Sequence, residues 1–275
     1  MSVVFRFLAL WPLCLLHALG AVMGGLAFLF SRQYRDRFRE NLAQAQLENR
    51  VGWRAIVSAG QMLSELPRLW FGRPVAVLWD GCEHIEDALH GGRGIIFLTP
   101  HLGCFEITAQ AYASRFGARQ PITVLYRPAR KAWLRALVDH SRRRPGLETA
   151  PTTLAGVKQL LKALKSGGCV GLLPDQVPPL GQGVWSPFFG RNAYTMTLAA
   201  RLALQTGAVV LLGWGERLSW GRGYAVHVQP LGQTLDKDQT VAAGQINQAM
   251  EQLICQVPEQ YLWGYARYKA PKADS

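Results

Sequence analysis

The hydrophobic pattern begins with one long apolar segment. From Phe7 to Phe30 the chain contains no Asp, Glu, Lys or Arg. As an α-helix this segment would be about 36 Å long, since each residue adds about 1.5 Å, and the hydrocarbon core of a bilayer is about 30 Å thick. The pattern therefore predicts a membrane-anchoring helix within residues 1–31. Pro12 and His17 interrupt the apolar run, so a kinked or partly embedded helix, or the buried helix of a soluble core, is an alternative to a straight span.

A cleaved signal peptide is a second alternative for this segment. The tripeptide Ala18-Leu19-Gly20 loosely resembles a cleavage site, but the apolar run continues beyond it, past the usual length of a signal peptide's hydrophobic region. Only Arg6 precedes the run, whereas four arginines follow it within residues 32–39. Because positive residues favour the cytoplasmic side of a membrane, this bias predicts that everything after Ser31 is cytoplasmic.

Two amphipathic helices are predicted next, over residues 34–48 and 51–72. In each segment apolar side chains recur at roughly helical spacing, as at Phe38 and Leu42 or at Leu66 and Trp70. Their arginine-rich faces fit either lipid headgroups or ordinary exposure to water.

Beyond residue 73, short apolar runs alternate with longer stretches of helical periodicity. The runs predicted as strands are Gly94–Leu98, Ile122–Leu125, Cys169–Leu173 and Val209–Trp214, and the predicted helices lie near residues 104–116, 130–143, 153–166, 194–206 and 238–255. Such alternation is typical of an α/β fold in which a mixed central sheet is flanked by helices. No repeat or linker divides this region, so residues 32–275 are expected to form one domain.

Composition narrows the class of partner. Lys and Arg number 30 against 18 Asp and Glu, which gives a net charge of +12. A nucleic acid, an anionic membrane surface, a phosphorylated lipid or an acidic carrier protein would complement this charge. The apolar fraction of 49% argues against disorder. The five cysteines are scattered without a C-x-x-C pair, which indicates reduced thiols and predicts neither a disulfide framework nor a metal site.

Candidate chemistry centres on His101, in the sequence H-L-G-C-F-E. The run Ile95–Leu98 is predicted as a buried strand that Thr99-Pro100 ends, and a helix is predicted from about residue 104. Open α/β sheets bind ligands at the carboxyl ends of their strands, where this pattern places His101. With His101 on the turn and Glu106 inside the helix, the carboxylate can fold back to the imidazole.

A His–Glu pair suits general base catalysis. A carboxylate bonded to one ring nitrogen fixes the tautomer and stabilises the imidazolium, which leaves the other nitrogen to remove a proton from an attacking hydroxyl. We therefore predict His101 and Glu106 as the catalytic pair. The structural alternative is that His101 caps the next helix and Glu106 is solvated. Cys104 is a candidate nucleophile, but a cysteine in such a position is more often a small buried apolar residue.

Other catalytic classes lack their signatures. The chain contains no G-x-S-x-G nucleophile elbow, no G-x-x-x-x-G-K-[ST] phosphate loop, no G-x-G-x-x-G fingerprint and no H-E-x-x-H metal motif. No cofactor and no metal ion are therefore expected.

Further motifs carry a resemblance to a known family. Besides the H-x-x-x-x-E of residues 101–106, they are Tyr126-Arg127-Pro128, Arg142-Arg143-Arg144, Pro174-Asp175-Gln176, Trp185–Gly190 and Pro258–Trp263. In this order and spacing they resemble the late lipid A acyltransferases, the lauroyl and myristoyl transferase family, over about residues 5–270. The related glycerolipid acyltransferases use H-x-x-x-x-D and typically add a P-E-G-[ST]-R block, which this chain lacks.

The resemblance implies an acyltransferase domain over residues 32–275, on the cytoplasmic face of the bacterial inner membrane. The donor it implies is an acyl carrier protein. The acceptor it implies is a hydroxyl of a 3-hydroxyacyl chain on a Kdo-bearing tetraacylated lipid A precursor. Inner membrane phospholipid is then the expected surrounding, and no nucleic acid partner is expected.

Four substrate-binding candidates also follow from the resemblance. Arg142 and Asp175 are motif positions, and Arg127 and Gln176 join them. The two guanidinium groups suit lipid phosphates, the carrier's phosphopantetheine or a developing oxyanion, and Asp175 is expected to fix an arginine by an ion pair. A purely structural arginine–carboxylate network is the alternative.

Two departures from the family pattern bear on the acceptor. Gly264-Tyr265-Ala266 stands where the family often has more polar residues, and Val177-Pro178-Pro179 is unusually rich in proline. One alternative is therefore a lysophospholipid or another lipid as acceptor. Another is a membrane-tethered nucleic-acid-binding protein, although the sequence contains no recognisable recognition helix or aromatic stacking platform.

Overall fold

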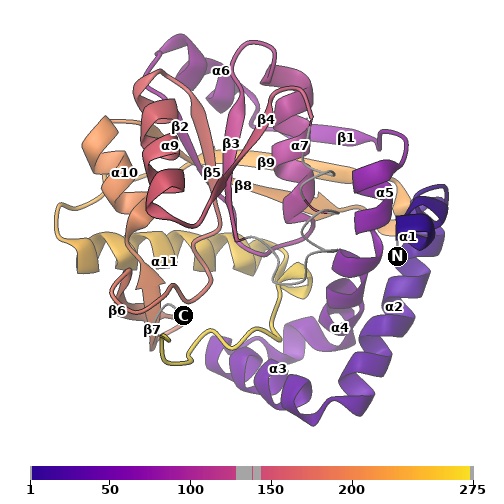
Figure 1. Cartoon of the computed structure of the whole chain (residues 1–275). Coiled ribbons are helices and arrows are strands. Elements are labelled where there is room, and N and C mark those ends of the chain that lie inside the picture. The colour runs from indigo at the N-terminus through magenta and orange to yellow at the C-terminus, as the bar shows by residue number, and fades with distance from the viewer. Residues whose placement is uncertain (1, 128–137, 139–143, 273–275) are drawn as a thin grey trace.

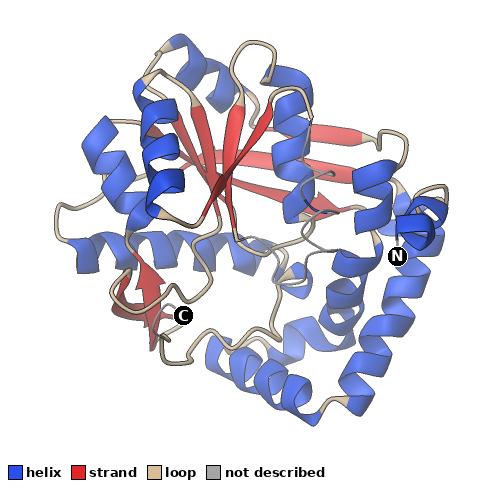
Figure 2. Ribbon diagram, in the orientation of Figure 1, coloured by secondary structure: helices blue, strands red, loops and turns tan. Residues whose placement is uncertain are grey.

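A seven-stranded sheet forms the centre of the molecule (Figures 1 and 2). The computed structural model describes residues 2–127, 138 and 144–272. In spatial order the strands are β1 (Val77–Asp80), β9 (Tyr224–Pro230), β8 (Val209–Arg217), β2 (Ile95–Leu98), β5 (Cys169–Leu172), β3 (Ile122–Tyr126) and β4 (Leu147–Pro151). The strands from β8 to β4 run parallel, while β9 and β1 run the opposite way because β8 and β9 pair antiparallel. The predicted mixed sheet is confirmed.

Helices cover both faces of this sheet. On one face lie α6 (Glu83–His90) and α7 (Phe105–Phe116), and on the other lie α9 (Leu154–Lys165), α10 (Leu198–Thr206) and α11 (Gln239–Gln256). The alternation of side chains along β2 supplies both cores. Ile95 and Phe97 pack in the core with α6 and α7, whereas Ile96 and Leu98 pack in the core with α9, α10 and α11.

The N-terminal quarter of the chain is helical and gathers at one side of the sheet (Figure 1). Its elements are α1 (Ser2–Leu8), α2 (Leu13–Phe30), α3 (Arg32–Ala45), α4 (Glu48–Ser64) and α5 (Leu66–Phe71). Proline has no backbone N–H to donate and fixes its own φ, so Pro12 suits the N-cap position just before α2 and separates that helix from α1. The chain is thus broken between Leu8 and Leu13, which fits the kinked alternative and not one continuous helix from Phe7 to Phe30.

Helix α2 is the one helix of the described residues that is long and apolar enough to cross a membrane by length and composition. It is also packed closely on α4. Gly20 and Gly24 of α2 face Gly60 of α4, where an added Cβ would collide with the Gly20 carbonyl oxygen, so the two backbones touch. The opposite face of α2 remains exposed through Leu15, Val22, Met23, Leu26, Leu29 and Phe30. The expected anchor is thus bound to the domain along one side.

Several elements differ from the expected ones. The helix expected over 194–206 begins only at Leu198, because Arg191–Met196 forms strand β7, which pairs with β6 (Gly183–Phe188) in a separate hairpin. The helix expected over 51–72 is divided at Glu65 into α4 and α5. The helix expected near 130–143 lies outside the described residues, apart from position 138. Two 3-10 helices, η1 (Ser219–Gly221) and η2 (Pro258–Gln260), complete the description.

Candidate active site

His101 lies just beyond the carboxyl end of β2. Strands β2 and β5 pair in parallel with Leu98 opposite Leu172, and the Thr99 N–H donates to the Leu172 carbonyl oxygen at 3.0 Å. His101 and Asp175 each follow a member of this pair by the same number of residues. The register of the two strands therefore brings these two loops side by side at the edge where open α/β sheets bind ligands.

Asp175 holds both the ring and the backbone of His101. The distance between His101 Nδ1 and Asp175 Oδ1 is 2.8 Å, and the His101 backbone N–H donates to Asp175 Oδ2 at 2.8 Å. On the other side of the ring, Gln176 Nε2 lies 3.0 Å from His101 Nε2 and donates to it. In this arrangement Nδ1 carries the ring proton and Nε2 keeps its lone pair. Its Nε2 can then accept a proton.

Asp175 remains ionised although its side chain is buried. Burial by itself raises the pKa of a carboxyl group, but here the electrostatic interaction with His101 and the hydrogen bonds from its ring and backbone outweigh it. With a smaller contribution from Arg267, these effects hold the pKa of Asp175 below its ordinary value. A buried carboxylate at Nδ1 is the arrangement that stabilises an imidazolium once Nε2 has taken up a proton.

Glu106 lies in the first turn of α7 and is buried. The imidazole's hydrogen bonds within the described residues go to Asp175 and Gln176, so none of them joins His101 directly to Glu106. Burial lowers the pKa of Arg144, and the negative charge of Glu106 partly offsets this effect. The carboxylate bonded to the ring is therefore Asp175, and not Glu106 as expected, while the catalytic role of Glu106 stays a prediction.

The remaining candidates are placed as follows. Gln176 contacts the imidazole, as described above. Arg127 directly follows β3 and is exposed; since β3 pairs in parallel with β5, Arg127 lies at the same edge of the sheet as Asp175. Arg142 lies outside the described residues. The structure therefore brings His101, Asp175 and Gln176 together, with Arg127 on the same edge.

The segment that follows the histidine, residues 101–104, is here called the His101 loop. Its backbone is fixed by two distant parts of the chain. The His101 carbonyl accepts from the Leu262 N–H at 3.1 Å, the Gly103 N–H donates to the Gln260 carbonyl at 2.9 Å, and the Cys104 N–H donates to the Gly215 carbonyl at 2.7 Å. The motif Pro258–Trp263 thus lies against the His101 loop, which gives it a structural reason to accompany the histidine.

Sequence reasoning missed the buried ion pair between Glu65 and Arg217. Glu65 is fully buried and Arg217 nearly so, and the Arg217 side chain reaches the Gly103 carbonyl oxygen of the His101 loop at 3.2 Å. The available signal was a lone acid in the otherwise uncharged stretch of residues 55–67. Without a partner visible in sequence, that signal could not be interpreted.

An apolar pocket lies between α7 and the sheet, next to the His101 loop. Its walls come from strands on both sides of β2 and from α6 and α7, and include Trp79, Ile85, Phe97, Phe105, Tyr112, Ile122, Leu147, Val226 and Val228. Thr99 and Glu106 add polar groups, and the Phe105 ring centroid is 5.1 Å from that of His101. Gly171 and Gly213 also line the pocket and leave it free of side chains there. Such walls suit a hydrocarbon chain.

Comparisons with known proteins extend over nearly the whole chain. It is 28% identical over 271 residues to the lipid A biosynthesis lauroyltransferase of Escherichia coli (strain K12), covering 94% of this chain and 86% of that protein. It is 27% identical over 269 residues to the lipid A biosynthesis palmitoleoyltransferase of the same strain, with the same coverage. A family model described as bacterial lipid A biosynthesis acyltransferase matches residues 1–270. The chain belongs to this family of acyltransferases.

Proposed function

We propose that this acyltransferase moves a fatty acyl chain from an acyl carrier protein to a hydroxyl of a 3-hydroxyacyl chain on a lipid A precursor. Membership of the lipid A acyltransferase family supports the lipid substrate. The observation that carries the proposal is His101, whose Nδ1 is hydrogen-bonded to the buried Asp175 carboxylate, beside an apolar pocket.

The reaction proceeds by direct attack of the acceptor on the donor. His101 Nε2 removes the proton of the acceptor hydroxyl as its oxygen bonds to the thioester carbonyl carbon. The Gln176 amide, which contacts Nε2 in the resting site, gives way to this hydroxyl. The tetrahedral intermediate then breaks its carbon–sulfur bond, and the imidazolium returns the proton to the departing sulfur. The products are an acylated lipid and the free thiol of the carrier.

Two carboxylates support the imidazolium that forms during this reaction. Asp175 keeps the proton on Nδ1 and balances the new positive charge. We retain Glu106 as the second acid, because its buried side chain lines the same pocket beside Phe105. In a buried site, its negative charge favours the imidazolium more strongly than it would in water.

The arginines are proposed to hold the anionic parts of the substrates. Arg127 is exposed at the edge of the sheet where His101 lies, so its guanidinium can meet a lipid phosphate or the donor's phosphopantetheine. Arg142 is proposed to bind the same anionic groups or to stabilise the developing oxyanion, and this proposal rests on the family resemblance alone. The apolar pocket is proposed to take the acyl chain of the donor.

Inner membrane phospholipid is proposed to cover the exposed apolar face of α2, with the catalytic domain on the cytoplasmic side. Helix α4, which packs along α2, carries the exposed Arg50 and Arg54, and these charges do not suit a hydrocarbon core. We therefore propose that α2 lies partly embedded in one leaflet beside the domain. The arginines of α3 and α4 would then meet anionic headgroups.

The test is acyl transfer by the purified protein in phospholipid-containing detergent micelles. A Kdo-bearing tetraacylated lipid A precursor is offered with lauroyl-acyl carrier protein or lauroyl-coenzyme A, and the products are weighed by mass spectrometry. We expect the precursor to gain one acyl mass, faster from the carrier protein. Acylation of a lysophospholipid in place of the precursor would overturn the proposed acceptor. Equal use of the two donors would overturn the proposal that the donor is an acyl carrier protein.

A further inference from the structure

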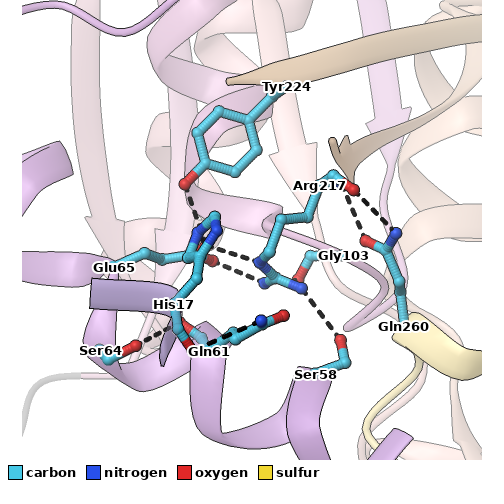
Figure 3. A network of polar contacts seen from close by, with 9 residues as sticks. All are labelled: His17, Ser58, Gln61, Ser64, Glu65, Gly103, Arg217, Tyr224 and Gln260. Carbon is cyan, nitrogen blue, oxygen red and sulfur yellow. Dashed lines mark hydrogen bonds and ion pairs between the residues drawn. The ribbon is translucent and has the colours of Figure 1, made fainter. Parts of the chain in front are cut away.

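A buried charge network joins helix α2 to the His101 loop (Figure 3). Arg217, at the end of β8, donates from Nε and from Nη2 to the two carboxylate oxygens of Glu65, each at 2.7 Å. The Tyr224 hydroxyl of β9 donates to Glu65 Oε2 at 2.9 Å. His17 of α2 places its Nε2 at 3.2 Å from the same oxygen. The Glu65 carboxylate is thus contacted by side chains from α2, β8 and β9.

Glu65 is ionised in this network. Burial would raise its pKa, but the charge and hydrogen bonds of Arg217, together with the contact from His17, lower the pKa of Glu65 to about 2. A buried pair of this kind adds little stability over apolar side chains of the same volume, and fixing one specific arrangement is the best-attested reason to keep one. The arrangement that is fixed here includes the His101 loop.

The Arg217 side chain also donates hydrogen bonds to the His101 loop and to α4. Nη2 donates to the Gly103 carbonyl at 3.2 Å, and Nη1 donates to Ser58 Oγ at 2.9 Å. The Arg217 backbone is held on both sides by the Gln260 side chain, at 2.8 Å to its N–H and 3.1 Å to its carbonyl. The Gln260 carbonyl in turn accepts from the Gly103 N–H. Arg217 therefore controls both polar groups of the Gly103 backbone, one directly and one through Gln260.

Gly103 has little freedom to move. Its φ is +59°, in the left-handed region that favours glycine, and an added Cβ would collide with the Gly215 carbonyl oxygen. It lies two residues after His101, whose own carbonyl is held by Leu262. A shift of Gly103 would therefore also displace the His101 imidazole, because the short loop is held at both ends by hydrogen bonds.

We propose that Arg217 is a positioning residue for His101, and that His17 makes this positioning depend on the docking of α2 against α4. The inference rests on the proposed function, because it takes His101 as the general base. The lipid-facing helix and the catalytic loop are linked through three buried side chains, His17, Glu65 and Arg217. Loss of the α2 contact should therefore slow the chemical step without weakening substrate binding.

The variants separate this role from simple stability. His17→Leu removes the contact to Glu65, and His17→Gln keeps an N–H donor there. Gly60→Ala pushes α2 away from α4 without touching any charged residue, because its new Cβ would meet the α2 backbone. Gly25→Ala is the matched control on α2, since no atom lies within 4 Å of the added carbon.

The measurements are kcat and KM for the donor, together with hydrogen exchange of the His101 loop amides followed by mass spectrometry, all in the same micelles. For His17→Leu and Gly60→Ala we expect kcat to fall about 10- to 100-fold, as a displaced catalytic group does. KM should change little, and loop exchange should become faster. His17→Gln should recover most of kcat, and Gly25→Ala should match the wild type in both measurements.

The opposite pattern would overturn the proposal. If His17→Leu lowers the melting temperature while kcat per folded molecule and loop exchange match the wild type, the network is only structural. The His17 pair decides the matter if Gly60→Ala does not fold. A wild-type protein that transfers no acyl chain would refute the proposed function, whereas active variants with unchanged loop exchange would refute only this inference.

Discussion

The contact between His101 Nδ1 and Asp175 decides which ring nitrogen accepts a proton. Because the carboxylate is buried and ionised, it favours a proton on Nδ1 and leaves the lone pair on Nε2. Gln176 occupies that lone pair in the resting site with a neutral donor that a substrate hydroxyl can replace. His101 is therefore the base, Asp175 is the acid that orients it, and Gln176 contacts Nε2 where the substrate hydroxyl is proposed to bind.

Charge removal at the two carboxylates tests their roles. Asp175→Asn keeps the size of the side chain but removes the charge that stabilises the imidazolium, so kcat should fall about 10²- to 10⁴-fold. Glu106→Gln should change kcat in the same direction, and adding it to His101→Ala should make little further difference if the residues act as a unit. Steady-state rates at saturating donor check both. Wild-type kcat in Glu106→Gln would remove Glu106 from the catalytic pair.

Acyl chain length should respond to Gly213, which leaves open space in the apolar pocket. A Cβ at this position would lie at ordinary contact distance, 3.5 Å, from the Phe97 ring, so β8 can accept an added Cβ there. Gly213→Val should shift donor preference toward shorter chains by about tenfold or more, since each buried methylene is worth about 0.8 kcal/mol. Competition between donors of different length measures this. An unchanged preference for donor chain length in a folded variant would show that the acyl chain does not bind in this pocket.

At the scale of elements, the sequence predicted best the strands that are buried on both faces. Strands β2 and β5 are fully buried and stand out as continuous apolar runs, whereas edge strands β1 and β4 mix polar and apolar residues and were missed. Motif resemblance named both His101 and Asp175. Their contact was not predicted, because it depends on the register of two strands that are distant in sequence.

The Glu65–Arg217 pair was missed for a related reason. The two residues are separated by 152 positions, and neither belongs to a periodic pattern that would indicate the other. Packing of α2 on α4 was also absent from the prediction, because an apolar helix has the same composition whether a membrane or a protein covers it. In the structure, three glycines distinguish the covered face of α2 from its exposed face.

The exposed face of α2 should contribute directly to membrane binding. Leu29→Glu places a charge on that face, where Leu29 is 63% exposed, and should weaken binding to anionic phospholipid vesicles about tenfold or more, since a buried leucine is worth about 1.5–3 kcal/mol. Leu154→Glu is the matched control, because Leu154 is 82% exposed on α9. Vesicle sedimentation compares the two. Equal binding of the two variants would show that α2 does not meet the lipid.

At the scale of the whole molecule, the N-terminal helices lie at one side of the sheet and the His101 loop is tied to them (Figure 1). In the proposed function, this arrangement lets a lipid acceptor arrive from the membrane while a soluble donor arrives from the side away from it. The net charge of +12 suits both anionic lipid headgroups and an acidic carrier protein. Charge complementarity of this kind acts mainly on the rate of encounter.

Donor use should therefore depend on salt. Raising ionic strength from about 0.1 M to 1 M shortens the screening length from about 10 Å to 3 Å, so kcat/KM for the acyl carrier protein donor should fall. An acyl-pantetheine thioester lacks the acidic carrier and serves as the control donor. Initial rates across a salt series, with acceptor and micelles held constant, give the comparison. Equal salt dependence for the two donors would argue against electrostatic recognition of the carrier.

The most direct test of the whole account is the turnover of His101→Ala. If Nε2 of His101 removes the proton of the lipid hydroxyl, kcat for acyl transfer to the lipid A precursor should fall about 10²- to 10⁴-fold. Circular dichroism and vesicle binding should match the wild type, because the backbone N–H of residue 101 still donates to Asp175 and the His101 loop keeps its backbone hydrogen bonds. Near-wild-type turnover in a folded, membrane-bound His101→Ala protein would contradict the account.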